Sequence, residues 1–405
     1  MTSLSIKQKA QQYVVLTGMA LFIGLLVGAI DMIFGQGLLL IGDFRSQHWP
    51  LILFLALAGL VIVYLYKRFG GKASKGMGLI FDVGHAREEK IPLVLVPLIM
   101  LTTWMSHLFG GSVGREGVAV QIGATLSHRF ARHIKIPDAS RIFLMTGMAA
   151  GFAGLFQTPL AATFFALEVL TVGELQLIAL YPALIASIVA SFTSHTLGLE
   201  KFAVPLRETL SWTPETLIKV ALLGLAFGLA GKLFAVSLSW LKKTVAKVLP
   251  NPYIRIAVIG AGLSLILLTL QLTKVGSYSG LGTNLIDVAF HQGSAQSYDW
   301  ILKLLFTVVT ISAGYQGGEV TPLFAIGATL GVFLAPLLGL PVLVVAAIGY
   351  ASVFGSATTT LLAPILIGGE VFGYDNLPFF VIACAIAYCL PKEWSIYSGQ
   401  KVAKK

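Results

Sequence analysis

Long apolar segments follow one another along the chain, and they restrict the solvents in which it can fold. Six uninterrupted runs occupy residues 13–34, 51–66, 91–107, 175–197, 217–245 and 256–272. A helix that crosses a bilayer needs about 20 such residues. Only 11% of the 405 residues are charged, against about 25% in ordinary globular domains. So few polar residues cannot cover a water-exposed surface, and the sequence therefore predicts an all-α, multi-pass integral membrane protein.

Basic residues lie in short loops between these runs, although the net charge of +10 alone would also suit a nucleic-acid-binding protein. Their positions predict cytoplasmic termini in the inner (plasma) membrane and contact with anionic lipid headgroups, not with nucleic acid. The three clusters are Lys67, Arg68, Lys72 and Lys75; Arg129, Arg132, His133 and Lys135; and Lys401, Lys404 and Lys405. Cys384 and Cys389 lie in an apolar run, and the seven histidines have no metal-ligand spacing, so we expect no disulfide, metal or other cofactor.

Other apolar stretches are interrupted. Residues 142–170 are broken at Gln157-Thr158-Pro159, and residues 323–390 carry Pro336, Pro341, Pro364 and Gly368-Gly369. Short helices broken at membrane depth survive only where they line a cavity inside the protein. Thr213-Pro214-Glu215, in contrast, has the cap, proline and acid of a well-formed helix start.

The chain also repeats itself at a spacing of about two hundred residues. Gly114-Arg115-Glu116 precedes Ile122-Gly123-Ala124-Thr125-Leu126, and Gly317-Gly318-Glu319 precedes Ile326-Gly327-Ala328-Thr329-Leu330. Residues 147–169 resemble residues 349–371 in the same way. We therefore predict a first membrane repeat over residues 1–200 and a second over residues 201–405, joined by the polar seam 198–214. Duplicated halves with interrupted helices are typical of transporters whose site lies between the repeats. Whether the halves are inverted depends on the number of spans, which these runs do not settle.

Residues 110–118 contain the segment with the most specific chemistry. Glycines surround Arg115 and Glu116, and a helix is expected to begin near Glu116. The free N–H groups and dipole at a helix start form an anion site, which Glu116 could fill or, when protonated, leave. That movement would couple an anion to a proton, and an acid in the membrane interior is usually functional. The alternative is that Glu116 only caps its helix. Residues 317–322 repeat the pattern, with the N–H groups of Glu319 and Val320 facing the same cavity, or with Glu319 as a simple cap.

Four segments in consistent order resemble the CLC chloride channels and anion/proton antiporters. Gly114-Arg115-Glu116-Gly117 matches G-[KR]-E-G-P, Phe156-Gln157-Thr158-Pro159-Leu160-Ala161 resembles F-N-x-P-L-A, Gly317-Gly318-Glu319-Val320-Thr321-Pro322 is similar to G-G-x-F-x-P, and residues 391–398 resemble the segment of the central tyrosine, here Tyr397. The resemblance implies a CLC-type bundle of tilted and broken helices, two inverted repeats, and a homodimer with one pore per subunit and no regulatory domain. It also implies that Glu116 is the external gating glutamate.

Departures from the family motifs point to one branch. Val118 replaces the last proline of the first motif, Met77 stands where a serine contacts the central anion, and Val169 replaces an inner proton-transferring glutamate. Glu319 replaces an apolar residue. Met77 and Glu319 together resemble the fluoride/proton antiporters of the family. Methionine is no useful hydrogen-bond donor to a large anion, whereas a protonated carboxyl group is a strong donor to fluoride.

We therefore predict, rather than an enzyme, an antiporter that exports fluoride in exchange for protons. Glu116 is predicted as gate and proton carrier and Glu319 as an anion-sensing or proton-passing group. The predicted anion-binding residues are Met77, Gly114, Arg115, Gly117, Val118, Val320, Thr321 and Tyr397. Without the resemblance, Tyr397 would be interpreted as an interfacial aromatic anchor.

Two alternatives and four further residues complete the prediction. A chloride-selective CLC protein is the nearer alternative, and only Met77 and Glu319 favour the fluoride branch over it. An intramembrane serine hydrolase would use Ser112 of the G-x-S-x-G pattern in residues 110–114, but no histidine stands out as its base. We expect Glu168, Glu370 and Asp31 to be water-exposed acids at the ends of spans, with a proton-handling role as the alternative for the two glutamates, and His107 to be a span-end residue.

Overall fold

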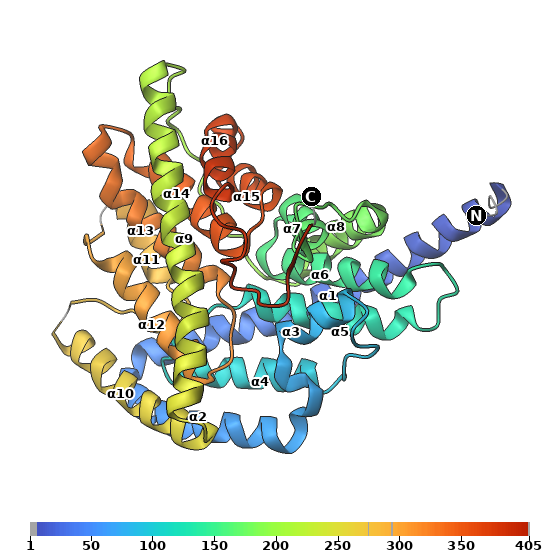
Figure 1. Cartoon of the computed structure of the whole chain (residues 1–405), viewed down its shortest axis with the longest axis horizontal. Helices are drawn as coiled ribbons and strands as arrows, with labels where there is room; N and C mark the ends of the chain where they lie inside the picture. The colour runs from blue at the N-terminus through green and yellow to red at the C-terminus, as the bar shows by residue number, and fades with distance from the viewer. Residues whose placement is uncertain (1–5, 274, 293–294, 404–405) are drawn as a thin grey trace.

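The computed structural model describes residues 6–273, 275–292 and 295–403, most of them in helices (Figure 1). Lys404 and Lys405 of the third basic cluster lie outside the described residues. In the first half the helices are α1 (Ile6–Gln47), α2 (Leu55–Leu65), α3 (Met77–Gly84), α4 (Leu95–Leu108), α5 (Glu116–Ala131), α6 (Ala139–Phe156), α7 (Pro159–Glu168) and α8 (Leu180–Thr196). In the second half they are α9 (Pro214–Val248), α10 (Pro252–Leu272), α11 (Thr283–Asp287), α12 (Asp299–Ala313), α13 (Val320–Leu338), α14 (Val342–Thr358), α15 (Leu362–Phe372) and α16 (Leu377–Tyr388).

Shorter segments connect these helices. Five have 3-10 or π-helical geometry: Trp49–Phe54, Tyr66–Gly70, Gly71–Lys75, Leu177–Ala179 and Val288–Gln292. Strands β1 (Thr171–Val172) and β2 (Lys401–Val402) pair in parallel, with Thr171 opposite Lys401. This pairing attaches the end of the chain to the segment that follows α7.

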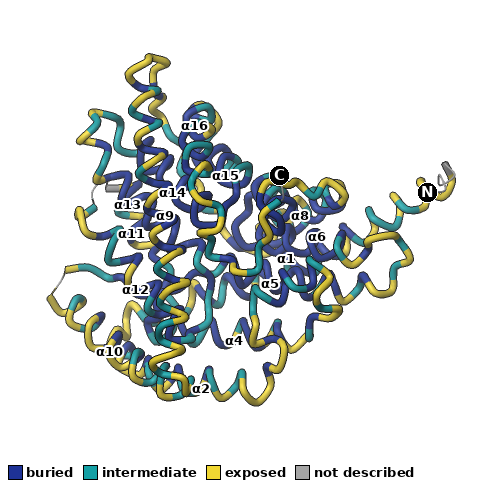
Figure 2. Tube along the Cα trace, in the orientation of Figure 1, coloured by how far each residue is buried: buried dark blue, intermediate teal, exposed yellow. Residues whose placement is uncertain are grey.

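The prediction of an all-α membrane protein is confirmed. Seven helical stretches within the described residues are long and apolar enough to cross a bilayer by length and composition. Figure 2 shows the buried interior running through α5, α6, α13 and α14, with exposed residues along α2, α9 and α10. Many exposed side chains on α9 and α10 are large and apolar, among them Leu222, Leu229, Val258 and Leu265. Lipid, and not water, is the solvent that such a surface suits.

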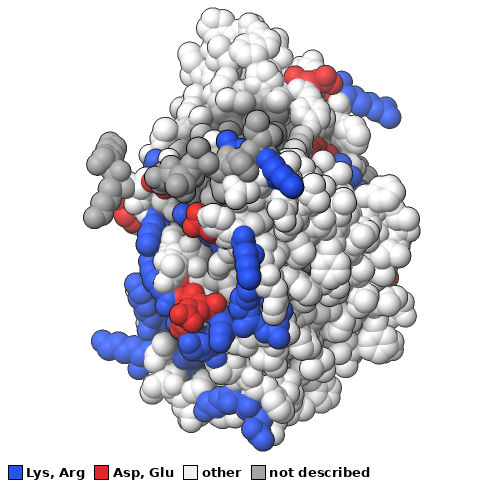
Figure 3. Space-filling model, turned by 90° about the vertical axis from the view of Figure 1, so that its right-hand side faces the viewer, with Lys and Arg blue, Asp and Glu red and all other residues white. Residues whose placement is uncertain are grey.

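Charged side chains have a different distribution. Lys and Arg gather over part of the side that Figure 3 turns toward the viewer, while much of the remaining surface in that view is uncharged. In the loops around α3, the Lys72 ammonium lies 2.6 Å from Glu88, and Lys75 lies 3.0 Å from Asp82. The hydrogen bond from Lys72, with the nearby charge of Lys75, lowers the pKa of Glu88. These contacts form a basic cluster of partly exposed side chains on and around α3.

The start of α9 agrees with its sequence pattern. The helix begins at Pro214, and the Thr213 hydroxyl accepts a hydrogen bond from the Thr216 N–H at 3.2 Å.

All six predicted runs contain helix, but their limits differ. α1 extends well beyond residues 13–34 at both ends.

The helix breaks are only partly where we predicted them. α6 ends at Phe156 and α7 begins at Pro159, as expected. In residues 323–390 helix stops between Leu338 and Val342, as Pro341 predicted, and again between Thr358 and Leu362 and between Phe372 and Leu377. Pro336 lies inside α13, and the expected breaks at Pro336, Pro364 and Gly368-Gly369 are wrong. Pro364 is in the first turn of α15, where a missing N–H is tolerated. Gly368 and Gly369 make room for rings: a Cβ on them would lie 2.5 Å from Phe380 and 2.4 Å from Tyr374.

Three acids expected in water are in other environments. Asp31 is wholly buried within α1, next to Gly154, and Glu168 is 8% exposed. Glu168 accepts hydrogen bonds from the N–H groups of Leu361, Leu362 and Ala363 at the start of α15. Glu370 is half-buried and accepts from Leu160 and Ala161 at the start of α7. Glu168 ends α7 and Glu370 lies in the last turn of α15, but each packs against the start of a helix from the other half.

Candidate functional site

The starts of α5 and α13 meet inside the bundle. α5 begins at Glu116 and α13 at Val320, as the glycine-rich segments predicted. The Gly114 N–H donates to the Gly318 carbonyl at 2.5 Å, and the Gly318 N–H donates to the Gly114 carbonyl at 2.7 Å. A Cβ on Gly114 would lie 2.8 Å from Pro322 and 3.0 Å from the Gly318 oxygen, so glycine is required for this approach. The two helix starts are thereby held against each other.

Glu116 extends from the start of its own helix to the start of α13. Its carboxylate is fully buried and accepts the Thr321 N–H at 3.0 Å and the Thr321 hydroxyl at 2.6–2.8 Å. The Arg115 guanidinium Nε lies 3.5 Å from the same carboxylate. An anion site formed by the start of α13 is therefore filled by a carboxylate of the chain itself. Thr321, which we predicted to donate to a transported anion, here donates to Glu116.

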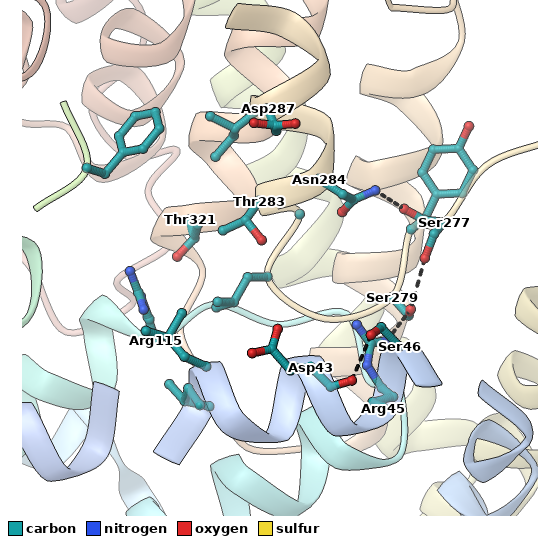
Figure 4. A pocket seen from close by; sticks show the side chains of 18 of the residues that line it. Asp43, Arg45, Ser46, Arg115, Ser277, Ser279, Thr283, Asn284, Asp287 and Thr321 are labelled. Carbon is teal, nitrogen blue, oxygen red and sulfur yellow. Dashed lines mark hydrogen bonds between the residues drawn. The ribbon is translucent and has the colours of Figure 1, made fainter. Parts of the chain in front are cut away.

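A cavity of about 810 Å³, here called the α11 cavity, approaches this carboxylate from one side. Figure 4 shows Asp43, Arg115, Thr283 and Thr321 around the hollow, contributed by α1, the start of α5, α11 and α13. Glu116 itself lines it. Phe156 and Tyr350 add an apolar wall, with the Tyr350 ring stacked 4.0 Å from that of Phe324.

A second cavity of about 270 Å³, here called the Tyr397 cavity, approaches the same helix starts. Met77, Gly117, Glu319 and Tyr397 all line it. A Cβ on Gly117 would lie 3.7 Å from Glu319 Oε2, which places that carboxylate directly beside α5. The Tyr397 ring lies 5.4 Å from Phe81, and its hydroxyl has no hydrogen-bond partner in the part of the chain that the structure describes.

The two cavities are separated by neighbouring residues of the same two helix starts. Glu116 and Thr321 line the α11 cavity, whereas Gly117 and Glu319 line the Tyr397 cavity. Lys242, near the C-terminal end of α9, lines the Tyr397 cavity, while Glu200 and Lys201, which precede α9 in the chain, line the α11 cavity. The two cavities share no lining residue. The Glu116 carboxylate stands between them.

Not every predicted site residue reaches a cavity. Arg115 lines the α11 cavity. Val118 and Val320 are buried in the first turns of α5 and α13 and are not among the residues that line either cavity. Gly114 acts through its backbone. Lys242 was missed, because a lysine in the last turns of an apolar helix resembles a membrane-surface residue in sequence.

Ser112, the serine of the hydrolase alternative, lies in the loop before α5 and bonds to α12, a helix that the sequence prediction did not include. Its hydroxyl is 2.9 Å from Lys303 Nζ and 2.9 Å from the Thr307 hydroxyl, both on α12. Ser112 and Lys303 are wholly buried. A serine–lysine pair can serve as a nucleophile and base, but an ester or peptide substrate has no access to this one. The polar residues of α12 recur every three or four positions, a pattern that could have identified them: Asp299, Lys303, Thr307 and Thr310.

Comparison with known proteins places this geometry among anion channels and transporters. A family model described as voltage gated chloride channel matches residues 58–392. The chain is 36% identical over 384 residues to a "Chloride/fluoride channel protein" of Pseudomonas syringae pv. tomato, covering 94% of this chain and 85% of the relative. It is 26% identical over 321 residues to a voltage-gated ClC-type chloride channel, ClcB, of Salmonella typhimurium, covering 77% and 74%.

Two solved structures share the fold. The crystal structure of a CLC-type fluoride/proton antiporter superposes with a TM-score of 0.95 at 50% identity, covering 99% of this chain and all of the other. A slow cyanobacterial Cl⁻/H⁺ antiporter superposes with a TM-score of 0.79 at 21% identity, covering 95% and 96%. At that identity the second likeness concerns the fold alone.

Proposed function

The chain belongs to the CLC family of voltage-gated chloride channels and anion/proton antiporters, and from this premise we propose that it is a fluoride/proton antiporter. Its task is transport and not catalysis: fluoride leaves the cell and protons enter in exchange. The observation that supports this most directly is the buried Glu116 carboxylate, bound to the start of α13 between two cavities.

The position of Glu116 connects anion and proton movement. While ionised, the carboxylate occupies the N–H and hydroxyl donors of Thr321 that an anion would use. Protonation removes its charge and weakens those hydrogen bonds, because charge-assisted bonds are about twice as strong as neutral ones. The side chain can then leave and a transported anion can take its place. Each cycle of this competition carries a proton in one direction and an anion in the other.

Two residues of the Tyr397 cavity support fluoride as that anion. Met77 provides no hydroxyl donor, and Glu319, when protonated, offers a strong donor to a small basic ion. The 50% identity with a CLC-type fluoride/proton antiporter extends over 99% of this chain and includes both regions. A chloride-selective exchanger would not gain from a carboxyl group in this position.

The remaining features of the proposal concern the assembly. Residues 1–200 and 201–405 form two inverted repeats, and the protein works as a homodimer with one pore per subunit in the inner membrane. The basic loops around α3 and after α5 are cytoplasmic, in keeping with the preference of cytoplasmic loops for Lys and Arg. The Tyr397 cavity then opens toward the cytoplasm.

Ion flux in liposomes tests the proposal. Purified protein is reconstituted with an outward fluoride gradient, and fluoride efflux and internal pH are recorded together, with chloride run in parallel. We expect fluoride efflux to draw protons inward, chloride to be nearly silent, and Glu116→Gln to abolish proton movement. Glu88→Gln, a salt-bridged acid outside both cavities, is the control. Equal chloride transport would assign the protein to the chloride exchangers, and fluoride efflux without protons would make it a channel.

A further inference from the structure

Residues 110–115, here called the gate loop, connect α4 to Glu116 and are held from two sides by the second half of the chain. On one side lies the paired backbone of Gly114 and Gly318. On the other side lies α12, whose residues Lys303, Thr307 and Thr310 all bond to Ser112. These side chains are wholly buried in a helix of a membrane bundle, where each ionisable residue calls for a reason.

Lys303 makes three hydrogen bonds, and all go to neutral oxygen atoms. Its Nζ donates to the Ser112 hydroxyl at 2.9 Å, the Gly280 carbonyl at 2.8 Å and the Tyr278 carbonyl at 3.3 Å. The three donors of the ammonium are thereby used completely. Two of the acceptors belong to residues 278–280, here called the clasp, and the third belongs to the gate loop. One side chain therefore joins two loops from different halves of the chain.

The clasp has its own attachments. The Tyr278 hydroxyl donates to Asp299 at 2.6 Å, one turn before Lys303 on α12. Gly280 donates its N–H to the Gly111 carbonyl at 3.0 Å. Arg45 of α1 donates to Ser279, as Figure 4 shows. The gate loop is thus enclosed by α12, the clasp and the Gly317–Gly318 backbone.

We propose that Lys303 is a positioning residue for ion exchange, which sets the Glu116 carboxylate on Thr321 by joining Ser112 of the gate loop to the clasp. Ser112 lies four residues before Glu116, and between them the chain is further restrained at Val113, which packs against Gly317, and at Gly114. These restraints leave the short segment little freedom to absorb a shift of Ser112, so such a shift would change the position of the Glu116 carboxylate. Hydrogen bonds from Thr321 at 2.6–3.0 Å tolerate little displacement. Lys303 itself touches neither transported ion.

Flux measurements on paired variants test this role, which rests on the proposed anion/proton exchange. Lys303→Met retains the length of the side chain and removes its donors, while Ser112→Ala removes one acceptor and leaves the lysine its two carbonyl partners. We expect Lys303→Met to lower coupled turnover at least tenfold and the number of protons moved per anion at least twofold. Ser112→Ala should have a smaller effect in the same direction, and the double variant should not exceed Lys303→Met. Lys219→Met, at a partly exposed lysine near the start of α9 that pairs with exposed Glu215, is the control and should behave as wild type.

The same substitution in a Glu116→Ala background separates positioning from general stability. Without the carboxylate, a residue that acts only through Glu116 has nothing left to position, so Lys303→Met should change anion flux less than twofold there. An equal tenfold loss in both backgrounds would overturn the proposal, and so would wild-type coupling in Lys303→Met or in Ser112→Ala. If the wild-type protein exchanges chloride instead of fluoride, the proposed fluoride selectivity is wrong. The role of Lys303 is then tested by the same comparison of variants, with chloride as the anion.

Discussion

Thr321 offers Glu116 two donors of different kinds. Its N–H is part of the α13 start and would be present with any residue but proline, whereas its hydroxyl depends on the side chain. Both donors converge on a single carboxylate that has almost no solvent exposure. The hydroxyl therefore adds to a site that the helix start alone would already form.

Removing that hydroxyl should weaken the proposed gating contact of Glu116. In Thr321→Val the shape of the side chain is retained, and the closed position of Glu116 loses a hydrogen bond to a charged group, about 1.5–3 kcal/mol. We expect fewer protons to move per fluoride ion while fluoride efflux itself does not slow, measured by simultaneous fluoride and pH recording. Thr329→Val is matched, because that buried threonine of α13 donates only to carbonyls of its own helix. Unchanged coupling in Thr321→Val would show that the N–H alone retains the gate.

At the level of helices, α7 and α15 hold each other by their ends. Glu168 ends α7 and accepts three N–H groups at the start of α15 at 2.8–3.1 Å. Glu370, in the last turn of α15, accepts two at the start of α7 at 2.8 and 3.1 Å. A carboxylate at a helix start satisfies free N–H groups and interacts favourably with the helix dipole. Both short helices therefore depend on a residue of the other.

We expect Glu168→Gln to cost stability more than transport. The amide cannot accept at both ends and carries no charge, so the loss should be about 1–3 kcal/mol, seen as a lower midpoint of thermal unfolding in detergent. Turnover in liposomes should stay within twofold of wild type. Glu174→Gln, an exposed acid in the loop after α7, is the comparison. Lost proton coupling with unchanged stability would instead make Glu168 a proton-handling residue.

Across the whole molecule, the same contacts recur in both halves. A Cβ on Gly123 of α5 would lie 2.1 Å from the Gly147 carbonyl oxygen of α6, and a Cβ on Gly327 of α13 would lie 2.1 Å from that of Gly349 in α14. Aromatic rings then join the halves: Phe156 of α6 stacks on Phe324 of α13 at 5.2 Å. The central helices can approach this closely only where a side chain is absent.

Alanine at either glycine should therefore be harmful to a similar degree. Gly123→Ala and Gly327→Ala each place a methyl group against backbone that cannot move aside, and overpacking costs about 1–3 kcal/mol. We expect both variants to unfold at lower temperature and to give less monodisperse protein on gel filtration. Gly262→Ala on α10 should be neutral or stabilising, because nothing lies within 4 Å of that position. A large fall in unfolding temperature in only one of the two variants would mean that close helix packing contributes unequally to stability in the two halves.

Much of the architecture follows from local properties of the chain. Apolar runs predicted the bundle, and glycine-rich segments before an acid predicted the starts of α5 and α13 correctly. The repeat also contains the second helix break: Gln157 and Thr359, 202 positions apart, both adopt a left-handed conformation with φ of 57° and 54°. Pro364 does not mark this break, because a proline in the first turn of a helix removes no intrahelical hydrogen bond.

Burial and partnership, in contrast, were decided only by tertiary structure. Sequence showed acids at span ends, but depth depends on which helix packs over them, so Asp31 and Glu168 were placed in water incorrectly. It showed a serine in a glycine-rich segment, but not that α12, almost two hundred positions away, holds Ser112 through Lys303. Composition and local motifs determined the solvent, the helices and the chemistry available at their starts. Contacts between the halves determined where Glu116 binds, because its Thr321 donors belong to the other half of the chain.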